Sequence, residues 1–127
     1  MHSWSGCITF VYSTLEGTSD MILIIGGAYQ GKHRYAQEHY TDRAVYYVQS
    51  LIKEAQERNT EATAYIEQIM LREPEAVFIL DDVGGGIVPI DRKDRDYREL
   101  VGRIGCMLAD SAQSVIRVCC GIGQVIK

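Results

Sequence analysis

A short apolar run that ends in a glycine-rich loop constrains the fold of this chain most strongly. Residues 21–25 read Met-Ile-Leu-Ile-Ile, and the next seven residues, Gly-Gly-Ala-Tyr-Gln-Gly-Lys, follow the pattern G-x-x-x-x-G-K. The apolar run predicts a strand that is buried on both faces. A helical pattern follows at residues 33–40. A strand, such a loop and a helix in this order are typical of a site that holds a phosphate group.

The chemistry of phosphate binding explains the composition of this loop. Small residues allow successive backbone N–H groups to curl around an anion, and the helix points its positive N-terminus at the same place. Lys32, on the first helical turn, can reach the β- and γ-phosphates of a nucleotide and stabilise the phosphoryl group during transfer. An ordinary strand–helix turn is the alternative interpretation. The expected nucleotide-binding residues are Gly26, Gly27, Ala28, Tyr29, Gln30, Gly31, Lys32 and His33.

The residue after the lysine departs from the usual pattern. It is normally Ser or Thr, whose hydroxyl coordinates Mg²⁺, but here it is His33. Because Mg²⁺ prefers oxygen ligands, an imidazole is a poor substitute. One interpretation is that His33 only begins the helix and has no ligand role. The backbone cradle does not need the hydroxyl, so we expect this substitution to affect catalysis more than nucleotide affinity.

Short apolar runs alternate with helical patterns along the rest of the chain. The further predicted strands cover residues 44–48, 76–80 and 115–119. The further predicted helices cover residues 51–73 and 94–111. Ser50 is the expected N-cap of the first of these helices and Pro74 its stop. The alternation predicts an α/β fold like that of P-loop NTPases, with a mainly parallel sheet, helices on both faces and ligands at the carboxyl ends of the strands.

Composition narrows the class of protein. A length of 127 residues predicts one domain, and 46% hydrophobic with 24% charged residues is typical of a soluble globular chain. A net charge of -4 without any basic run argues against binding to nucleic acid. The apolar runs are too short to span a membrane. No pair of cysteines has the C-x-x-C spacing, and no signal-peptide pattern is present, so we expect buried reduced thiols and a cytoplasmic location.

A second candidate site begins at two adjacent carboxylates, Asp81 and Asp82. Residues 77–82 read Val-Phe-Ile-Leu-Asp-Asp, which is the form of a strand ending in a ligand for Mg²⁺. Acidic residues also end strands for solubility, so both interpretations stay open. In the first, Asp82 is a catalytic residue that holds Mg²⁺ or accepts the proton of a substrate hydroxyl. The residues after it that would allow a ligand to approach the backbone are Gly84, Gly85 and Gly86.

Two arginines are further candidates for phosphate binding. Arg95 and Arg98 lie one helical turn apart and could pair with phosphate oxygens through their guanidinium forks. A solvated helix face, shared with neighbouring acidic residues, is the alternative. In the predicted second strand, Tyr46 and Tyr47 alternate, so we expect one of them to pack in the core.

Several motifs together resemble the adenosylcobinamide kinase / adenosylcobinamide-phosphate guanylyltransferase family of cobalamin synthesis. Those proteins carry a G-G-A-x-S-G-K-S loop, an N-E-V-G-x-G-I-V-P loop, an R-x-F-R-D-x-x-G helix start and a terminal G-x-P-x-x-x-K. The counterparts here, in the same order, are residues 26–33, 81–89, 95–102 and 121–127. The resemblance covers about residues 21–35 and 77–127.

The resemblance implies a transferase, a kinase that phosphorylates adenosylcobinamide with ATP or GTP and Mg²⁺, and a homo-oligomer. It also places the family's start at Met21, which makes residues 1–20 an N-terminal extension or the result of a misjudged start codon, and residues 21–127 a single nucleotide-binding domain. The family's R-I-x-x-H stretch, whose histidine carries the guanylyl group, has no counterpart among His2, His33 and His39. We therefore expect the guanylyltransferase activity to be lost.

A second function stays open beside the kinase. A nucleotide-binding pseudoenzyme or regulatory protein would keep the phosphate cradle and lack catalysis. His33 and the shortened middle of the chain favour this alternative, whereas Lys32 and the second glycine-rich loop favour the kinase. A generic small-molecule kinase would explain the first loop but not residues 82–89.

Overall fold

The computed structural model describes residues 20–81 and 92–127 of the chain, without the side chains of Arg92 and Asp94. Its strands are β1 (Ile22–Gly26), β2 (Val45–Tyr47), β3 (Val77–Asp81), β4 (Ser114–Cys119) and β5 (Ile122–Val125). Its helices are α2 (Lys32–His39), α3 (Val48–Glu57), α4 (Ala62–Arg72) and α5 (Arg92–Ser111). Within these ranges, no helix combines the length and the apolar character needed to cross a membrane.

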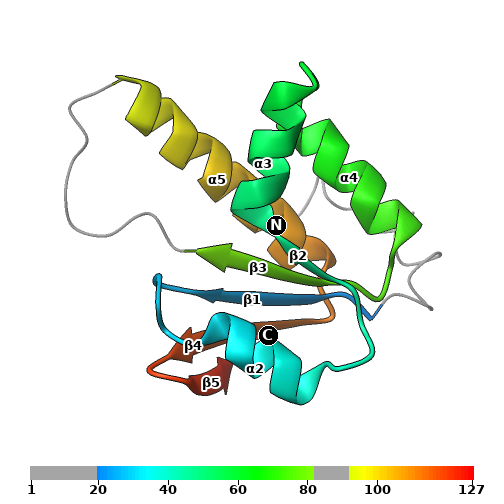
Figure 1. Ribbon diagram of the computed structural model, residues 1–127, viewed down its shortest axis with the longest axis vertical. Helices are drawn as coiled ribbons and strands as arrows, with labels where there is room; N and C mark the ends of the chain where they lie inside the picture. The colour runs from blue at the N-terminus through cyan, green and yellow to red at the C-terminus, as the bar shows by residue number, and fades with distance from the viewer. Residues whose placement is uncertain (1–19, 82–91) are drawn as a thin grey trace.

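The strands form one sheet in the order β2-β3-β1-β4-β5 (Figure 1). β1 lies at the centre and pairs in parallel with β3 and β4, while β2 pairs in parallel with β3. Among the described strands, only β5 runs antiparallel, against β4. The strands β1 to β4 agree with the sequence prediction within one residue at each end. The predicted α/β fold with a mainly parallel, P-loop-like sheet is therefore confirmed.

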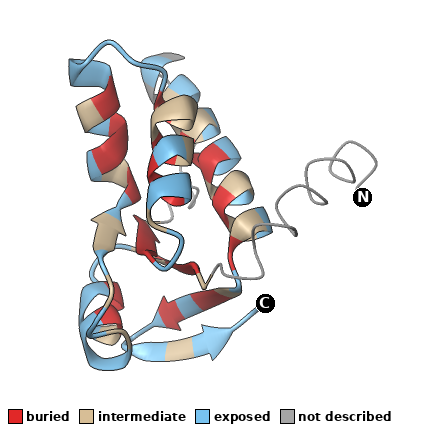
Figure 2. Ribbon diagram, turned by 90° about the vertical axis from the view of Figure 1, so that its right-hand side faces the viewer, coloured by how far each residue is buried: buried red, intermediate tan, exposed pale blue. Residues whose placement is uncertain are grey.

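Helices cover both faces of the sheet, as expected. α3, α4 and α5 pack on one face and α2 on the other (Figure 1). The period of two along a strand produces this division. In β1, Leu23 belongs to the core under α3, α4 and α5, whereas Ile24 belongs to the core under α2. Figure 2 shows the buried residues along the strands and on the sides of the helices that meet them.

The predicted helix over residues 51–73 is two helices, which corrects the sequence interpretation. The chain reverses after α3, where Asn59 has φ 53° and the Thr60 backbone N–H donates to the Ala55 carbonyl oxygen over 2.9 Å. Glu61 then caps α4 by accepting from the Ala64 N–H. Ser50 lies inside α3 and is not its N-cap. Folding back lets both halves bury their apolar residues in one core.

The end of the chain forms a β-hairpin that the sequence analysis missed. A two-residue turn joins β4 to β5, and its residues, Cys120 and Gly121, have φ values of 52° and 79°. Two positive φ values are what a type I′ hairpin turn requires. Cys120 lies in this turn, whereas Cys119 is the last residue of β4. Both are exposed free thiols, as is Cys106, so the prediction of buried cysteines is wrong for these three; Cys7 lies outside the described residues.

Candidate functional site

The candidate site lies where β1 and β3 end side by side. Gly26, the last residue of β1, is the register partner of Asp81, the last residue of β3. A side chain does not fit at Gly26, because a Cβ there would lie 2.4 Å from the carbonyl oxygen of Val118. At the other end of the loop, Gly31 has φ 92° and immediately precedes α2. Glycine thus meets a conformational or steric requirement at both ends of the loop.

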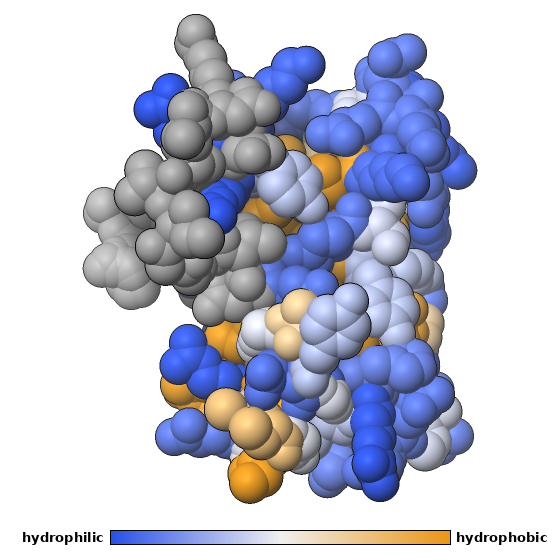
Figure 3. Space-filling view, turned by 60° about the vertical axis from the view of Figure 1, so that its left-hand side comes forward, coloured by the Kyte–Doolittle hydropathy of each residue, from blue (hydrophilic) through white to orange (hydrophobic). Residues whose placement is uncertain are grey.

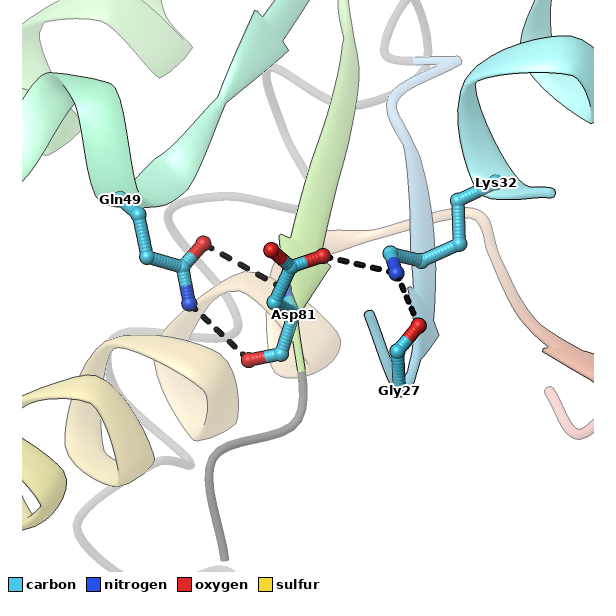
Figure 4. A network of polar contacts seen from close by, with 4 residues as sticks. All are labelled: Gly27, Lys32, Gln49 and Asp81. Carbon is cyan, nitrogen blue, oxygen red and sulfur yellow. Dashed lines mark hydrogen bonds and ion pairs between the residues drawn. The ribbon is translucent and has the colours of Figure 1, made fainter. Parts of the chain in front are cut away.

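Lys32 and Asp81 form an ion pair at the centre of this site (Figure 4). The Lys32 ammonium nitrogen lies 2.7 Å from Asp81 Oδ1 and also donates to the carbonyl oxygen of Gly27 over 2.5 Å. The Lys32 side chain is 5% exposed, and in the described part of the chain it is the only buried charged residue. The Asp81 side chain is 47% exposed. A buried charge needs such a partner, since unpaired burial is costly.

Gln49 is a site residue that sequence reasoning missed. Its side-chain amide donates to the Asp81 carbonyl oxygen over 2.9 Å and accepts from the Asp81 N–H over 3.3 Å (Figure 4). The register of β2 against β3 ends with Tyr47 opposite Ile79. The Gln49 amide therefore continues the ladder by one more pair after the backbone has turned into α3. No sequence motif marks this residue; only its place two residues after a strand points to it.

A histidine and a tyrosine meet beside the ion pair. The Tyr47 hydroxyl and His33 Nδ1 form a hydrogen bond, and the two rings stack with centroids 5.7 Å apart. Partial burial raises the pKa of the Tyr47 hydroxyl, and the negative charge of Asp81 raises it further. The same two causes raise the pKa of Tyr97, on α5. Both phenols are thus protonated at neutral pH.

The neighbouring tyrosine behaves as predicted. Tyr46 packs against the core and stacks on Phe78, with ring centroids 5.6 Å apart. Tyr47, by contrast, is 40% exposed.

The middle of the glycine-rich loop is tied to the β4–β5 hairpin. The Gln30 side-chain oxygen accepts from the Cys120 N–H over 2.8 Å, and its carbonyl oxygen accepts from the Gly121 N–H over 2.7 Å. Gln30 therefore anchors the loop. Ala28 and Tyr29 are exposed, and Tyr29 has φ 61°.

The structure separates the two candidate arginines. Arg98 on α5 lines a groove of about 320 Å³ together with Asp81, between α5 and the strands β1, β3 and β4. Arg95 is exposed and does not line this groove. Figure 3 is turned so that the side toward which β1 and β3 point in Figure 1 comes forward, and the described surface in this view is mostly hydrophilic with some hydrophobic residues between. Of the two, Arg98 is better placed to act beside Asp81.

The remaining sequence candidates, Asp82, Gly84, Gly85 and Gly86, lie outside the described residues. Within the described ranges, no three His, Cys, Asp or Glu side chains group closely enough to hold a metal ion. Mg²⁺ is usually bound by one or two carboxylates, with phosphates and water completing its shell. Asp81, half exposed beside Lys32, fits the part of one such carboxylate.

Comparison with known proteins assigns the family. A family model described as cobinamide kinase / cobinamide phosphate guanyltransferase matches residues 41–126. The chain is 36% identical over 69 residues to the bifunctional adenosylcobalamin biosynthesis protein CobU of Escherichia coli (strain K12). This alignment covers 54% of this chain and 38% of that protein. It is 42% identical over 53 residues to the protein of the same name from Salmonella typhimurium (strain LT2). That alignment covers 42% of this chain and 29% of the relative. The matches thus span well under half of these relatives. The chain belongs to the cobinamide kinase / cobinamide phosphate guanyltransferase family.

Proposed function

We propose that this chain binds ATP or GTP at residues 26–33 and transfers the γ-phosphoryl group to the hydroxyl of adenosylcobinamide. The family supports the reaction class, and the names of the relatives place them in adenosylcobalamin biosynthesis. The observation that carries the proposal is the buried Lys32 ammonium, which the loop holds 2.7 Å from the carboxylate at the end of β3. A phosphate that enters the loop would take the place of Asp81 as the partner of this cation.

Each residue then has a chemical role. Lys32 would bind the β- and γ-phosphates and stabilise the charge that develops in transfer. Asp81 would hold Mg²⁺ together with the phosphates, and the ion would supply charge neutralisation at the transferring group. The hydroxyl oxygen forms the new bond to the γ-phosphorus as the bond to the β-phosphate oxygen breaks. The hydroxyl proton goes to a carboxylate, for which we propose Asp82.

We further propose that guanylyl transfer is absent. Covalent transfer in this family uses the histidine of the R-I-x-x-H stretch, which has no counterpart here. The described histidines, His33 and His39, both lie on α2. The His39 ring stacks on Tyr35, with centroids 4.0 Å apart, and His33 is engaged by Tyr47. Neither histidine lies in the family's nucleophile motif.

A nucleotide-binding regulatory protein without catalysis is the second candidate. The observation that favours it is His33, which occupies the position where a hydroxyl normally completes the Mg²⁺ shell. Nucleotide affinity does not need that hydroxyl, whereas phosphoryl transfer depends on a correctly held metal ion.

Turnover measurements separate the two functions. Purified protein is incubated with Mg·ATP or Mg·GTP, with and without adenosylcobinamide, and phosphorylated product is quantified. The kinase proposal expects product that requires adenosylcobinamide and is lost in Lys32→Ala but kept in Lys53→Ala, which changes an exposed lysine on α3. Nucleotide binding without product would favour the regulatory protein. Absence of nucleotide binding would overturn both.

A further inference from the structure

We propose that His33 donates its Nε2–H to a phosphate oxygen of the bound nucleotide, and that Tyr47 is the positioning residue that fixes this tautomer. This inference rests on the proposed nucleotide site and specifies how that site replaces the missing hydroxyl. His33 follows Lys32 in the first turn of α2, where backbone N–H groups and the helix dipole already favour an anion.

The direction of the hydrogen bond between Tyr47 and His33 decides which ring nitrogen carries the proton. A phenol O–H is a stronger donor than a neutral imidazole N–H, and the unprotonated imidazole nitrogen is a stronger acceptor than the phenol oxygen. The nearby Asp81 carboxylate further disfavours loss of the Tyr47 proton. Tyr47 therefore donates and His33 Nδ1 accepts. The single proton of the neutral imidazole then sits on Nε2.

This tautomer changes what the position can bind. An Nε2–H group is a donor, so it pairs with an anionic oxygen and cannot coordinate a cation. In the usual loop, the Ser or Thr oxygen at this place binds Mg²⁺. Here the residue after Lys32 carries a donor. The site thus gains a contact to phosphate that needs no metal and gives up a ligand for the metal.

The other described histidine supplies an internal contrast on the same helix. His39 Nδ1 lies 3.0 Å from the carbonyl oxygen of Tyr35, which can only accept. When neutral, His39 therefore carries its proton on Nδ1, the opposite tautomer to His33. Because the two rings share a helix, a difference between them reports their hydrogen-bond partners.

Nitrogen-15 NMR of the full chain tests the tautomer directly. Spectra are recorded at about pH 8, and His33→Gln assigns the His33 signals. We expect Nε2–H at His33 and Nδ1–H at His39, with Tyr47→Phe moving His33 toward a mixture and leaving His39 unchanged. An Nδ1–H tautomer at His33 in the wild-type protein would overturn the inference.

ATP binding tests the contact to phosphate. Dissociation constants are measured with a chelator present and then with Mg²⁺, for the wild type, His33→Ala, Tyr47→Phe and the control His39→Ala. Loss of a hydrogen bond to a charged group predicts weakening by about tenfold or more for His33→Ala without metal, a smaller effect for Tyr47→Phe and none for the control. If the wild type binds ATP and both variants match it without metal, the donor role is wrong. If the wild type binds no ATP in either condition, the proposed function itself fails.

Discussion

The side chain of Gln49 holds the backbone of Asp81 by two hydrogen bonds, although 32 residues separate them. β2 is only three residues long, and its backbone leaves the sheet before it reaches the level of Asp81. The Gln49 amide makes the next pair of hydrogen bonds to β3 in place of the β2 backbone, and it holds the end of β3 in position. The carboxylate that faces Lys32 is therefore positioned by a residue on another strand–helix junction.

Gln49→Ala should destabilise the protein and weaken nucleotide binding together. The substitution leaves the Asp81 N–H and carbonyl without their partners, and an unsatisfied buried group costs about 1–3 kcal/mol. Urea unfolding measures the stability, and calorimetric titration with ATP measures the affinity. The matched control is Gln56→Ala, at an exposed position of the same helix. If the two variants have equal stability and equal ATP affinity, the hydrogen bonds from Gln49 to Asp81 have no role.

ATP or GTP should raise the melting temperature of the wild-type protein. A ligand at 100 times its dissociation constant stabilises the folded state by about 2.7 kcal/mol. Lys32→Ala should lose much of this shift, because each charge-assisted contact contributes about 1.5–3 kcal/mol. Thermal scans with and without millimolar nucleotide provide the measurement. No shift for the wild type would contradict a phosphate loop at residues 26–33.

Incubation with labelled GTP should leave the protein without a covalent label. The chain lacks the histidine context that carries the guanylyl group in the family, and a covalent intermediate needs a nucleophile. The label is assayed after denaturation, so that bound but uncoupled nucleotide is removed. A stable, acid-labile label on the denatured chain would show that another nucleophile of the chain has taken over the role.

His33→Ser should increase the Mg²⁺ dependence of ATP binding. The serine hydroxyl would restore an oxygen ligand for Mg²⁺ bound with the nucleotide. The same change removes the proposed Nε2–H donor, so binding with the metal chelated should weaken. ATP titrations of both proteins, with Mg²⁺ and then with chelator, give the four affinities. If Mg²⁺ changes the ATP affinity of both proteins equally, His33 has no role in nucleotide or metal binding.

We expect the protein to be a homo-oligomer in which a second copy of the chain covers the free edge of β5. β5 pairs only with β4 among the described strands, and Ile122, Val125 and Ile126 are exposed along it and just beyond. Exposed apolar edge strands invite pairing with another chain. Analytical ultracentrifugation should find a multimer for the wild type and a smaller species for Val125→Lys. A monomeric wild type at micromolar concentration would contradict this expectation.

Local sequence signals are sufficient to predict several elements of this fold. The apolar runs of β1, β3 and β4, and the positions of α2 and α5, follow from residue periodicity. The strand–helix alternation predicts a mainly parallel sheet whose carboxyl ends carry Lys32 and Asp81, whereas the pairing of β1 with β3 is seen only in the structure. The predicted features need only neighbouring residues and the handedness of crossovers.

Features that depend on contacts between residues far apart in the sequence became visible only in the folded chain. The break at Asn59 is favoured because α3 and α4 bury their apolar faces together, and a helical pattern alone does not show where such a chain must turn back. The hydrogen bonds of Gln30 and Gln49 have no local signal, since their partners lie 90 and 32 residues away. A side-chain amide can satisfy a distant backbone group wherever the fold brings it, and periodicity carries no information about that encounter.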